Sequence, residues 1–487
     1  MNSSRESRFF GKGRVPRTAA LVQLGCDKNT VDGERILGEL DSAGYEIVGL
    51  PLELWEKAGE TGEETGGSKG WRPVDVLVVN TCSFISPART ESRKAVERAV
   101  RLRKRQIVKE IVVAGCFAPL LAHRLPGELR RNVRAFLGPG DLSRVAERIE
   151  GKGEQAGQDE PFFRPPARSL DPGPRFLTSS AGTAFVKIAD GCDKGCSFCS
   201  IPFYRGGFRS RPKEEIAEEI AGLLRLGVRE VVLVSQDTAH WGRDRGEDLA
   251  ELLRFLARKA EREAGIREYR IRLHYLYPSC VTDRLLDVWA DCDIFVPYFD
   301  IPIQHASPKV LRAMNRPPDP DGIRRIVESI RERFSESAIR TTVITGHPGE
   351  GEKEFGELIS FLEEIRFDRV GVFPFFKEPG TAAARMRRPR GGFEVARRRA
   401  DRILEIQGSI SAERLRARVG RRYRVLMDTP WTGRSPLEAP DVDGVIQLKR
   451  PSVPGRMVDV EIVAALDHDL EGRLVEEKEC RKVTQGK

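Results

Sequence analysis

Three cysteines spaced C-x3-C-x2-C constrain this chain more than any other feature, because one short loop must present three thiolates together. Cys192, Cys196 and Cys199 directly follow an apolar run. Iron–sulfur clusters are usually held by four thiolates, so three on one loop favour a four-iron cluster with one iron left open. A structural zinc site needs four ligands, and no nearby Cys or His supplies the fourth. A thioredoxin-like pair needs only C-x2-C, which leaves Cys192 unexplained.

A second set of cysteines follows three strand-like runs in the first segment. Residues 17–150 alternate such runs with helical stretches, which is typical of an open parallel α/β sheet. Three of the runs end at Cys26, Cys82 and Cys116. Ligands bind beyond the carboxyl ends of parallel strands, so these cysteines can converge although they are far apart in the sequence. One free Cys is often just a small buried residue, but three in the same topological position predict a second metal–sulfur site.

The central segment, residues 182–412, repeats a strand and a helix six times and predicts a partial TIM-like (β/α)6 barrel. The expected strands are Phe185–Ala189, Val231–Ser235, Arg270–Tyr275, Phe295–Ile301, Arg340–Thr345 and Val370–Phe375. Chemistry in such barrels sits at the carboxyl ends of the strands. The unusual residues expected at that rim are Gln236, Asp237, His274, Gln304, His305 and Gly346.

The last segment, residues 415–480, contains short β-like runs, among them 423–427, 444–448 and 457–463, and predicts a small antiparallel β-barrel. Asp428 to Glu479 includes twelve acids against six Lys and Arg. The stretch just before it, 387–424, has thirteen Arg and four acids, which equals the net charge of +9 of the whole chain. Such density is typical of phosphate binding or of a solvated helix face, and both readings stay open.

The remaining composition favours a cytoplasmic protein without a membrane span. No run approaches the ~20 apolar residues that a spanning helix needs. Nine cysteines without a short secreted scaffold indicate a reducing compartment and metal binding rather than disulfides. Cys280, Cys292 and Cys480 have no partner at ligand spacing. We interpret 1–16 as a basic tail, 57–70 as a polar loop insertion and 151–181 as an interdomain linker.

These motifs resemble those of the radical S-adenosylmethionine (SAM) superfamily. The three-cysteine loop follows the first strand of the barrel and has an aromatic residue, Phe198, before its last cysteine. The preceding domain and a C-terminal barrel similar to a TRAM domain narrow the resemblance to the methylthiotransferases. The matching motifs of the first domain are Leu24-Gly25-Cys26, Asn80-Thr81-Cys82 and Ala114-Gly115-Cys116. The family usually has Phe or a similar residue where His347 stands, and the insertion near 57–70 and the long linker also depart from its pattern.

The resemblance implies two [4Fe–4S] clusters and SAM as cofactors. Cys192, Cys196 and Cys199 would hold the catalytic cluster, whose open iron binds the amino and carboxylate groups of SAM and yields a 5′-deoxyadenosyl radical. Cys26, Cys82 and Cys116 would hold an auxiliary cluster that carries the inserted sulfur, and a second SAM would supply the methyl group. The residues expected to contact SAM are Gln236, Asp237, Gln304 and Gly346.

Two branches of the family differ in substrate. One thiomethylates an adenosine of tRNA, and the other, RimO-type, thiomethylates the β-carbon of an aspartate in the small-subunit ribosomal protein numbered twelve. The second branch is favoured by the stretches 25–35, 235–238, 272–278, 300–307 and 439–444. A net-acidic barrel also suits a basic ribosomal protein better than RNA, and Asp441, Asp443 and Asp459 are its expected docking acids.

Two hypotheses from other classes remain as alternatives. An iron–sulfur electron carrier or redox sensor would need neither the barrel rim nor the C-terminal module. An RNA-binding accessory protein would need basic charge on the small barrel, which the residue count does not give. For the enzyme we expect a flavodoxin- or ferredoxin-like electron donor, a ribosomal protein substrate that is free or in the small subunit, and a monomer.

Overall fold

The computed structural model describes residues 16–58, 72–151, 173–179, 181–266, 268–387 and 391–475. Most of the predicted basic tail, of the polar insertion and of the predicted linker therefore lies outside the described residues, as does Cys480. The chain forms two units, which are Met1–Thr178 with Phe203–Gly206, and Ser179–Pro202 with Gly207–Lys487. We call them unit 1 and unit 2.

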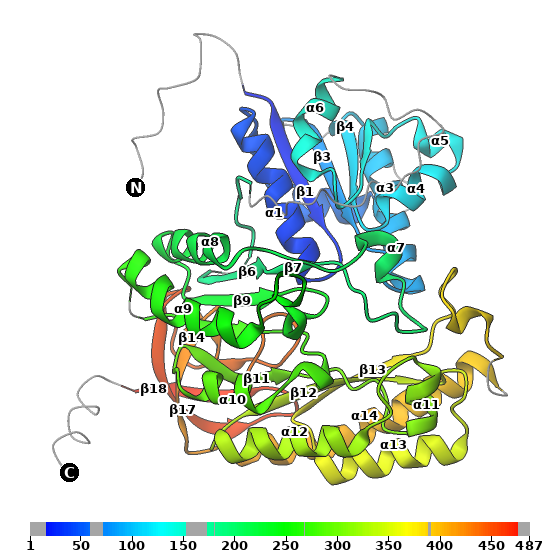
Figure 1. The fold of residues 1–487 in the computed structure, drawn as a ribbon. Coiled ribbons are helices and arrows are strands. Elements are labelled where there is room, and N and C mark those ends of the chain that lie inside the picture. Colours follow the sequence, from blue (N-terminus) through cyan, green and yellow to red (C-terminus); the bar gives the residue numbers. More distant parts are fainter. Residues whose placement is uncertain are drawn as a thin grey trace. The chain divides into compact units, whose positions relative to one another are not determined.

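Unit 1 is built around a parallel five-stranded sheet in the order β2-β1-β3-β4-β5 (Figure 1). Strand β3 is buried along its whole length because both faces are covered. Its Val76 packs in a cluster with Ile36, whereas Leu77 packs in another cluster with Val96. The strands are β1 (Thr18–Gln23), β2 (Glu46–Ile47), β3 (Val74–Thr81), β4 (Val108–Gly115) and β5 (Ala135–Leu137). The helices are α1 (Asp27–Ser42), α2 (Leu52–Lys57), α3 (Ser86–Lys104), α4 (Ala118–Arg124), α5 (Gly127–Arg130) and α6 (Val145–Glu150).

The described end of the predicted linker is packed against α1. Phe176 donates its backbone N–H to Glu34 O at 3.0 Å. Arg175 forms a buried ion pair with Glu34 at 2.5 Å, and Thr178 N donates to Glu34 Oε1 at 2.8 Å. Residues 173–178 are therefore part of unit 1, and Glu34 is the side chain that holds them.

Unit 2 contains a parallel six-stranded sheet in the order β13-β12-β11-β10-β9-β6, which confirms the predicted partial barrel. The six predicted strands agree with the observed ones to within two residues at each end. The strands are β6 (Thr183–Lys187), β9 (Glu230–Val234), β10 (Arg270–Leu273), β11 (Phe295–Asp300), β12 (Ala338–Thr345) and β13 (Arg369–Pro374), and β7 (Ala189–Asp190) pairs with β8 (Arg209–Ser210). The helices are α8 (Lys213–Arg225), α9 (Leu249–Ala264), α10 (Asp283–Ala290), α11 (Pro308–Ala313), α12 (Pro320–Arg333), α13 (Glu352–Ile365) and α14 (Gly392–Arg416).

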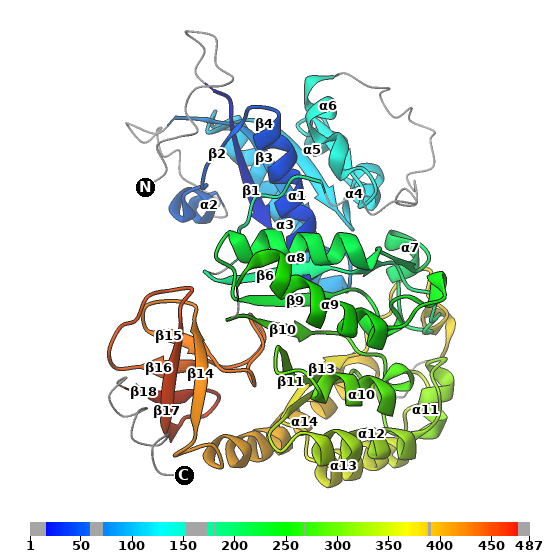
Figure 2. The same cartoon turned by 60° about the vertical axis from the view of Figure 1, so that its left-hand side comes forward.

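The C-terminal part of unit 2 is a closed five-stranded barrel, as predicted (Figure 2). Its pairs are antiparallel except for β16–β18, which is parallel. Strands β15 and β18 escaped prediction because each has a central glycine, which weakens the strand signal. Yet a Cβ at Gly472 would collide with Val460, so the barrel needs that glycine. The strands are β14 (Arg422–Met427), β15 (Thr432–Arg434), β16 (Ile446–Leu448), β17 (Met457–Ala465) and β18 (Leu470–Leu474).

A buried carboxylate joins the amino end of the six-stranded sheet to this barrel. Glu230, fully buried at the start of β9, accepts from Arg272 at 2.6 Å, from Arg270 at 2.9 Å and from Arg434 of β15 at 2.7 Å. Burial alone would raise the pKa of Glu230, but the three arginines outweigh it and hold the pKa well below its usual range. The ionised Glu230 therefore fixes β15 to the sheet.

Asp443 makes a second link of this kind, and its predicted role as a docking acid is wrong. Its side chain is 0% exposed and pairs with Arg340 at 3.0 Å. Its Oδ2 accepts from Tyr298 OH at 2.7 Å. Asp441 is exposed and Asp459 is half-exposed, although Asp459 pairs with Arg424 at 3.2 Å. The carboxylate of Asp443 is therefore satisfied within unit 2, because its partners Tyr298 and Arg340 belong to the six-stranded sheet.

We expect Glu230→Gln to lower the stability of unit 2 by about 3–5 kcal/mol, because it leaves buried arginines without their shared counter-charge. Equilibrium unfolding in urea, followed by tryptophan fluorescence, measures this loss. The folded-state pKa of Glu230 is depressed. Its contribution is therefore complete above the unfolded-state pKa of ~4.3 and declines as the pH falls below that value.

Glu268→Gln is the matched control, because Glu268 pairs with Arg424 at the surface, where its side chain is 52% exposed. Exposed pairs contribute about 0–1 kcal/mol. Equal losses in the two variants at neutral pH would contradict the structural role of Glu230.

Candidate metal centres

The carboxyl ends of three neighbouring strands place one cysteine set together in unit 1. Cys26 follows β1, Cys82 follows β3 and Cys116 follows β4, which are adjacent in the sheet. A Cβ at Gly25, next to Cys26, would lie 3.3 Å from Cys82 Sγ. Charge on Cys26 and on Cys82 also raises the pKa of Cys116. The structure therefore brings these three predicted residues to one edge of the sheet.

Amide side chains and glycines hold this edge in shape. Asn80 Nδ2 donates to Asn29 O at 2.7 Å, and Asn29 Nδ2 donates to Leu24 O at 2.6 Å. Gly115, before Cys116, has a φ of 93°, and a Cβ there would lie 2.5 Å from Thr81 O. Only glycine fits a left-handed backbone so close to the neighbouring strand. These hydrogen bonds and the close backbone approach at Gly115 hold the strand ends in place without a bound ligand.

The thiols of this set are suited to a metal rather than to acid–base chemistry. Burial raises the pKa of Cys116 to about 12 despite the opposing charge of Arg205, and burial also raises the pKa of Cys82. Such thiols are protonated at neutral pH. Binding to a metal deprotonates them, because the ion's own charge stabilises the thiolate. The donor set therefore fits an iron–sulfur group.

The second set lies on the loop that follows β7 in unit 2. Burial raises the pKa of Cys192 to about 11 and that of Cys199 to about 12. Charge on Cys196 contributes to both shifts. Like the buried thiols of the set in unit 1, those of Cys192 and Cys199 are protonated at neutral pH and suited to binding a metal.

The spacing of the sulfur atoms bears on what each cysteine set can hold. Among the described residues, only Asp237, His240 and Cys280 bring three potential ligand atoms within 4.8 Å of one another. Tetrahedral zinc with Zn–S bonds of ≈ 2.3 Å needs its sulfur atoms about 3.8 Å apart. The sulfur atoms of neither cysteine set meet the 4.8 Å limit, and a wider spacing is compatible with the larger core of a [4Fe–4S] cluster.

The Asp237, His240 and Cys280 group already surrounds a cation of the protein itself. Lys194 Nζ lies 3.4 Å from Asp237 Oδ2, 3.3 Å from His240 Nδ1 and 3.5 Å from Cys280 Sγ. Lys194 belongs to the cysteine loop, and its ammonium also lies 4.5 Å from the centre of the Tyr277 ring. These side chains therefore anchor the loop. Asp237, a predicted SAM contact, and Cys280, predicted to have no role, both belong to this anchor.

Residues after α11 support the same loop, and sequence reasoning missed them. Ser197 N donates to Met314 O and Asn315 Nδ2 donates to Gly195 O, both at 2.9 Å. Arg316 Nη1 lies 3.7 Å from Cys196 Sγ. The available signal was the sequence Met-Asn-Arg-Pro-Pro at 314–318, in which two prolines end the helical stretch.

The rim of the six-stranded sheet carries an unpaired acceptor and two strained residues. Gln236 Oε1, after β9, is buried without a hydrogen-bond partner among the described residues. Tyr275 and Gln304, after β10 and β11, have φ values of 63° and 69°. Positive φ is uncommon outside glycine and clusters at ligand sites. The rim therefore fits a ligand that donates hydrogen bonds, as SAM does through its amino and hydroxyl groups.

Gly346 and His347, after β12, have packing roles. A Cβ at Gly346 would collide with Ala396 of α14, and its N–H donates to Glu350 Oε2 at 2.8 Å. His347 packs edge-on against Phe375, and its Nε2 lies 3.2 Å from Ser197 Oγ. Burial lowers the pKa of His347 to about 4, so the ring is neutral at pH 7. His347 therefore packs as an aromatic residue, which accounts for its departure from the family pattern.

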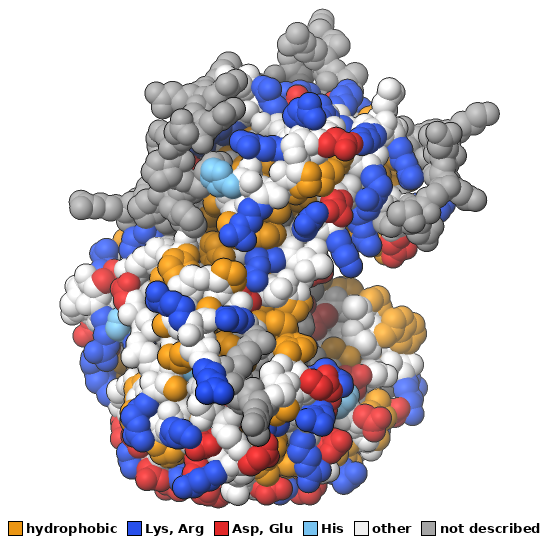
Figure 3. Space-filling view, turned by 90° about the vertical axis from the view of Figure 1, so that its right-hand side faces the viewer, with side chains coloured by type: hydrophobic (Ala, Val, Ile, Leu, Met, Phe, Trp, Pro, Cys, Tyr) orange, Lys and Arg blue, Asp and Glu red, His pale blue; other side chains and the backbone are white. Residues whose placement is uncertain are grey.

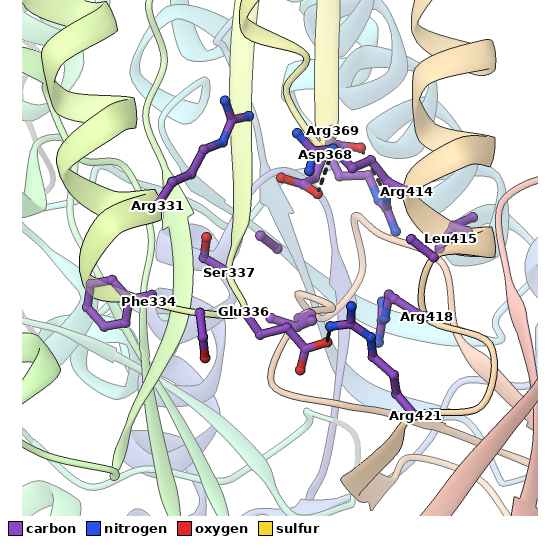
Figure 4. Close-up of a pocket in the computed structure, with 14 residues that line it drawn as sticks. Arg331, Phe334, Glu336, Ser337, Asp368, Arg369, Arg414, Leu415, Arg418 and Arg421 are labelled. Atoms are coloured by element: carbon purple, nitrogen blue, oxygen red, sulfur yellow. Dashed lines mark hydrogen bonds and ion pairs between the residues drawn. The ribbon is translucent and has the colours of Figure 1, made fainter.

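A cavity of ≈ 220 Å³ lies at the opposite end of the sheet, near the amino ends of β12 and β13 (Figure 4). Arg331 and Arg414 line it and donate to Arg366 O, at the C-terminus of α13, at 3.1 and 3.0 Å. Arg421, also in its lining, pairs with Glu336. These contacts cap a helix and neutralise charge, and barrel chemistry sits at the other end of the strands. The cavity is therefore not our candidate site.

The basic stretch on α14 is largely paired with acids. Arg397 lies 2.9 Å from Glu394 and 3.4 Å from Asp401, and Arg402 lies 3.0 Å from Glu405. In Figure 3 the acidic and basic side chains of unit 2 are intermixed on the face shown. This favours the solvated helix face over a phosphate-binding strip. Among the described residues, no helix combines the length and the hydropathy that crossing a membrane requires.

We expect Gln236→Leu to weaken SAM binding by up to about tenfold, since one hydrogen bond contributes about 0.5–1.5 kcal/mol. Titration calorimetry of the reconstituted protein with SAM measures the change. Gln447→Leu is the control, because Gln447 is exposed on the small barrel and bonds only Asp469 among the contacts described. Equal SAM affinity of the Gln236 variant and the parent would exclude Gln236 as a contact.

Family models match three parts of the chain. The Radical SAM superfamily model covers residues 186–362, the TRAM domain model covers 419–475, and the model of uncharacterized protein family UPF0004 covers 63–138. The first range runs from within β6 through β12 into α13, the second contains all five strands of the small barrel, and the third contains β3, β4 and β5 of unit 1.

Curated relatives match nearly the whole chain. A ribosomal protein uS12 methylthiotransferase RimO from Symbiobacterium thermophilum is 39% identical over 95% of this chain and 92% of its own. The proteins of the same name from Gloeobacter violaceus and Akkermansia muciniphila are 38% and 35% identical, each over 94% of this chain and 99% of its own.

Solved structures share the fold. The radical SAM methyltransferase TsrM from Kitasatospora setae aligns with a TM-score of 0.53 at 17% identity, over 76% of this chain and 77% of that chain. The cobalamin-dependent radical enzyme OxsB aligns with a TM-score of 0.51 at 12% identity, over 76% of this chain and 54% of that chain. At such identities the likeness concerns the fold alone.

Proposed function

Because this chain belongs to the RimO family of ribosomal protein uS12 methylthiotransferases, we propose that it thiomethylates the β-carbon of an aspartate in uS12. The observation that carries the proposal is the pair of three-cysteine sets at strand ends, in a chain whose relatives of this name match it almost end to end. The reaction is a sulfur and methyl transfer that depends on SAM.

The loop set is proposed as the catalytic centre. Cys192, Cys196 and Cys199 would hold a [4Fe–4S] cluster with one open iron for the amino and carboxylate groups of SAM. When bound, this cluster and SAM supply the radical that removes a hydrogen atom from the substrate. Arg316 donates to Cys196 Sγ and stabilises its thiolate charge.

The residues of the rim would bind SAM and keep water away. Gln236 Oε1 offers a buried acceptor, and Gln304, at a positive φ, is held by backbone hydrogen bonds to Thr342 and Ile344 of β12. Phe198 and His347 pack against each other behind the loop, with ring centres 6.3 Å apart. Gly346 is a less direct candidate, because its N–H already donates to Glu350. Asp237 forms an ion pair with Lys194 at 3.4 Å, but both its carboxylate oxygens are buried without a hydrogen-bond partner among the described residues.

The set in unit 1 is proposed to hold the second [4Fe–4S] cluster. Cys26, Cys82 and Cys116 supply three ligands and leave one iron open to carry the sulfur that is methylated and inserted. A second SAM molecule would supply the methyl group. Cys26 is exposed while Cys82 and Cys116 are partly covered, so this centre opens to the surface on one side.

The substrate proposal rests on the names of the full-length relatives and on charge. The relatives favour uS12 over tRNA adenosine. The net-acidic stretch 428–479 is also better matched to a basic protein than to RNA. We further propose a flavodoxin- or ferredoxin-like electron donor and a cytoplasmic location, and the monomeric state stays a prediction.

We expect Cys196→Ala to abolish formation of 5′-deoxyadenosine, because a cluster with two remaining ligands is unsupported. Cys82→Ala should retain 5′-deoxyadenosine formation but lose thiomethylation, since the set in unit 1 serves sulfur delivery. The assay is anaerobic incubation of reconstituted enzyme with dithionite, SAM and either uS12 or tRNA, followed by mass spectrometry. Cys292→Ala is the control, because Cys292 belongs to neither set.

Full thiomethylation by the Cys82 variant would overturn the assignment of two centres. A thiomethyl mass gain on tRNA adenosine, with none on uS12, would overturn the substrate. No 5′-deoxyadenosine from the parent enzyme would overturn the radical chemistry itself.

A further inference from the structure

One guanidinium outside the predicted site reaches a cysteine of unit 1. Helix α7 (Ile201–Arg205) begins two residues after Cys199, and its last three residues belong with Gly206 to unit 1. Arg205, the final residue of the helix, is 3% exposed in its side chain. A charge buried this deeply needs partners.

Three hydrogen-bond partners of Arg205 lie at the edge of the sheet described above. Its Nε donates to Cys116 Sγ at 3.2 Å. Its Nη1 donates to Asp32 Oδ2 at 2.7 Å, and its Nη2 lies 3.4 Å from Asn29 Oδ1. Asp32 is 0% exposed and Asn29 locks the strand ends. The planar guanidinium is therefore aimed by α1 at one sulfur atom.

A purely structural ion pair would look different. Arg175 and Glu34 form such a pair in the same unit, with side chains 9% and 0% exposed, and Arg175 bonds only oxygen in the contacts described. Arg205 has the same kind of carboxylate partner but also directs Nε–H at Sγ. Of these contacts, only the hydrogen bond from Arg205 Nε to Cys116 Sγ acts on a proposed cluster ligand.

The contact has a definite electrostatic effect. A positive charge and an N–H···S hydrogen bond both stabilise negative charge on sulfur. Reduction adds one electron to a cluster, so its potential depends on net charge and on hydrogen bonds to its sulfur ligands. Removing Arg205 should therefore make reduction of a cluster bound at Cys116 less favourable.

We propose that Arg205 is a positioning residue that fixes Cys116 Sγ and raises the reduction potential of the auxiliary cluster. The inference rests on the proposed function, because it requires a cluster on Cys26, Cys82 and Cys116. The inference assigns two roles to segment 192–205. This continuous stretch carries the three cysteines of the catalytic loop and also Arg205, whose guanidinium contacts Cys116.

The test uses the full chain with Cys192, Cys196 and Cys199 all changed to Ala, so that only the auxiliary cluster assembles. A redox titration followed by electron paramagnetic resonance gives its midpoint potential. Arg205→Gln should shift the potential to more negative values, and Arg205→Lys, which keeps the charge without the guanidinium fork, should shift it less. Arg175→Gln, the matched control, removes a buried charge that touches no cysteine in the contacts described and should leave the potential unchanged.

An unchanged potential in Arg205→Gln would overturn the proposal and leave Arg205 with a structural role only. If Arg205→Gln assembles no cluster, the potential of the Arg205→Lys variant provides the test. A cluster in Arg205→Lys with the potential of the parent would also overturn the proposal. A parent background that assembles no cluster would instead contradict the auxiliary centre of the proposed function. The two failures are therefore distinguishable.

Discussion

The parallel register of neighbouring strands is the constraint on which the cysteine set of unit 1 and the rim of the six-stranded sheet depend. Thr81 pairs with Gly115 in the β3–β4 ladder, so the next residues, Cys82 and Cys116, must be neighbours. Gln23 pairs with Asn80 in the β1–β3 ladder, which brings the end of β1 to the same edge. In unit 2 the same rule aligns the ends of six strands at one rim. A register slip of one residue would turn alternate side chains to the other face and dismantle the edge.

Buried charges hold this framework and limit what remains for recognition. Glu230 and Asp443 each tie the small barrel to the six-stranded sheet, and Arg418 pairs with Glu438 in the same interface. A count of acidic residues in the sequence does not distinguish these buried acids from acids on the surface. In the folded unit Glu230, Asp443 and Glu438 neutralise arginines, so the net charge of the stretch 428–479 overstates the acidity that a basic substrate would meet.

The sequence predicted the parts that depend on period and position, namely the six barrel strands, the closed barrel and the cysteines at strand ends. It did not predict contacts between distant residues, because no local pattern encodes them. Lys194 meets Cys280 86 residues away, Arg316 meets Cys196 120 residues away, and Arg205 meets Asp32 across 173 residues. The buried role of Asp443 was missed for the same reason, since its partner Tyr298 is 145 residues distant.

The central claim is that each unit builds its own iron–sulfur centre from three cysteines. Chemical analysis of iron and sulfide with Mössbauer spectroscopy tests it most directly, on the reconstituted chain and on two triple alanine variants, one for each cysteine set. We predict about eight irons per chain in the parent and about four in each variant, all as [4Fe–4S] clusters. A parent with about four irons, or a triple variant that retains the full content, would contradict the account.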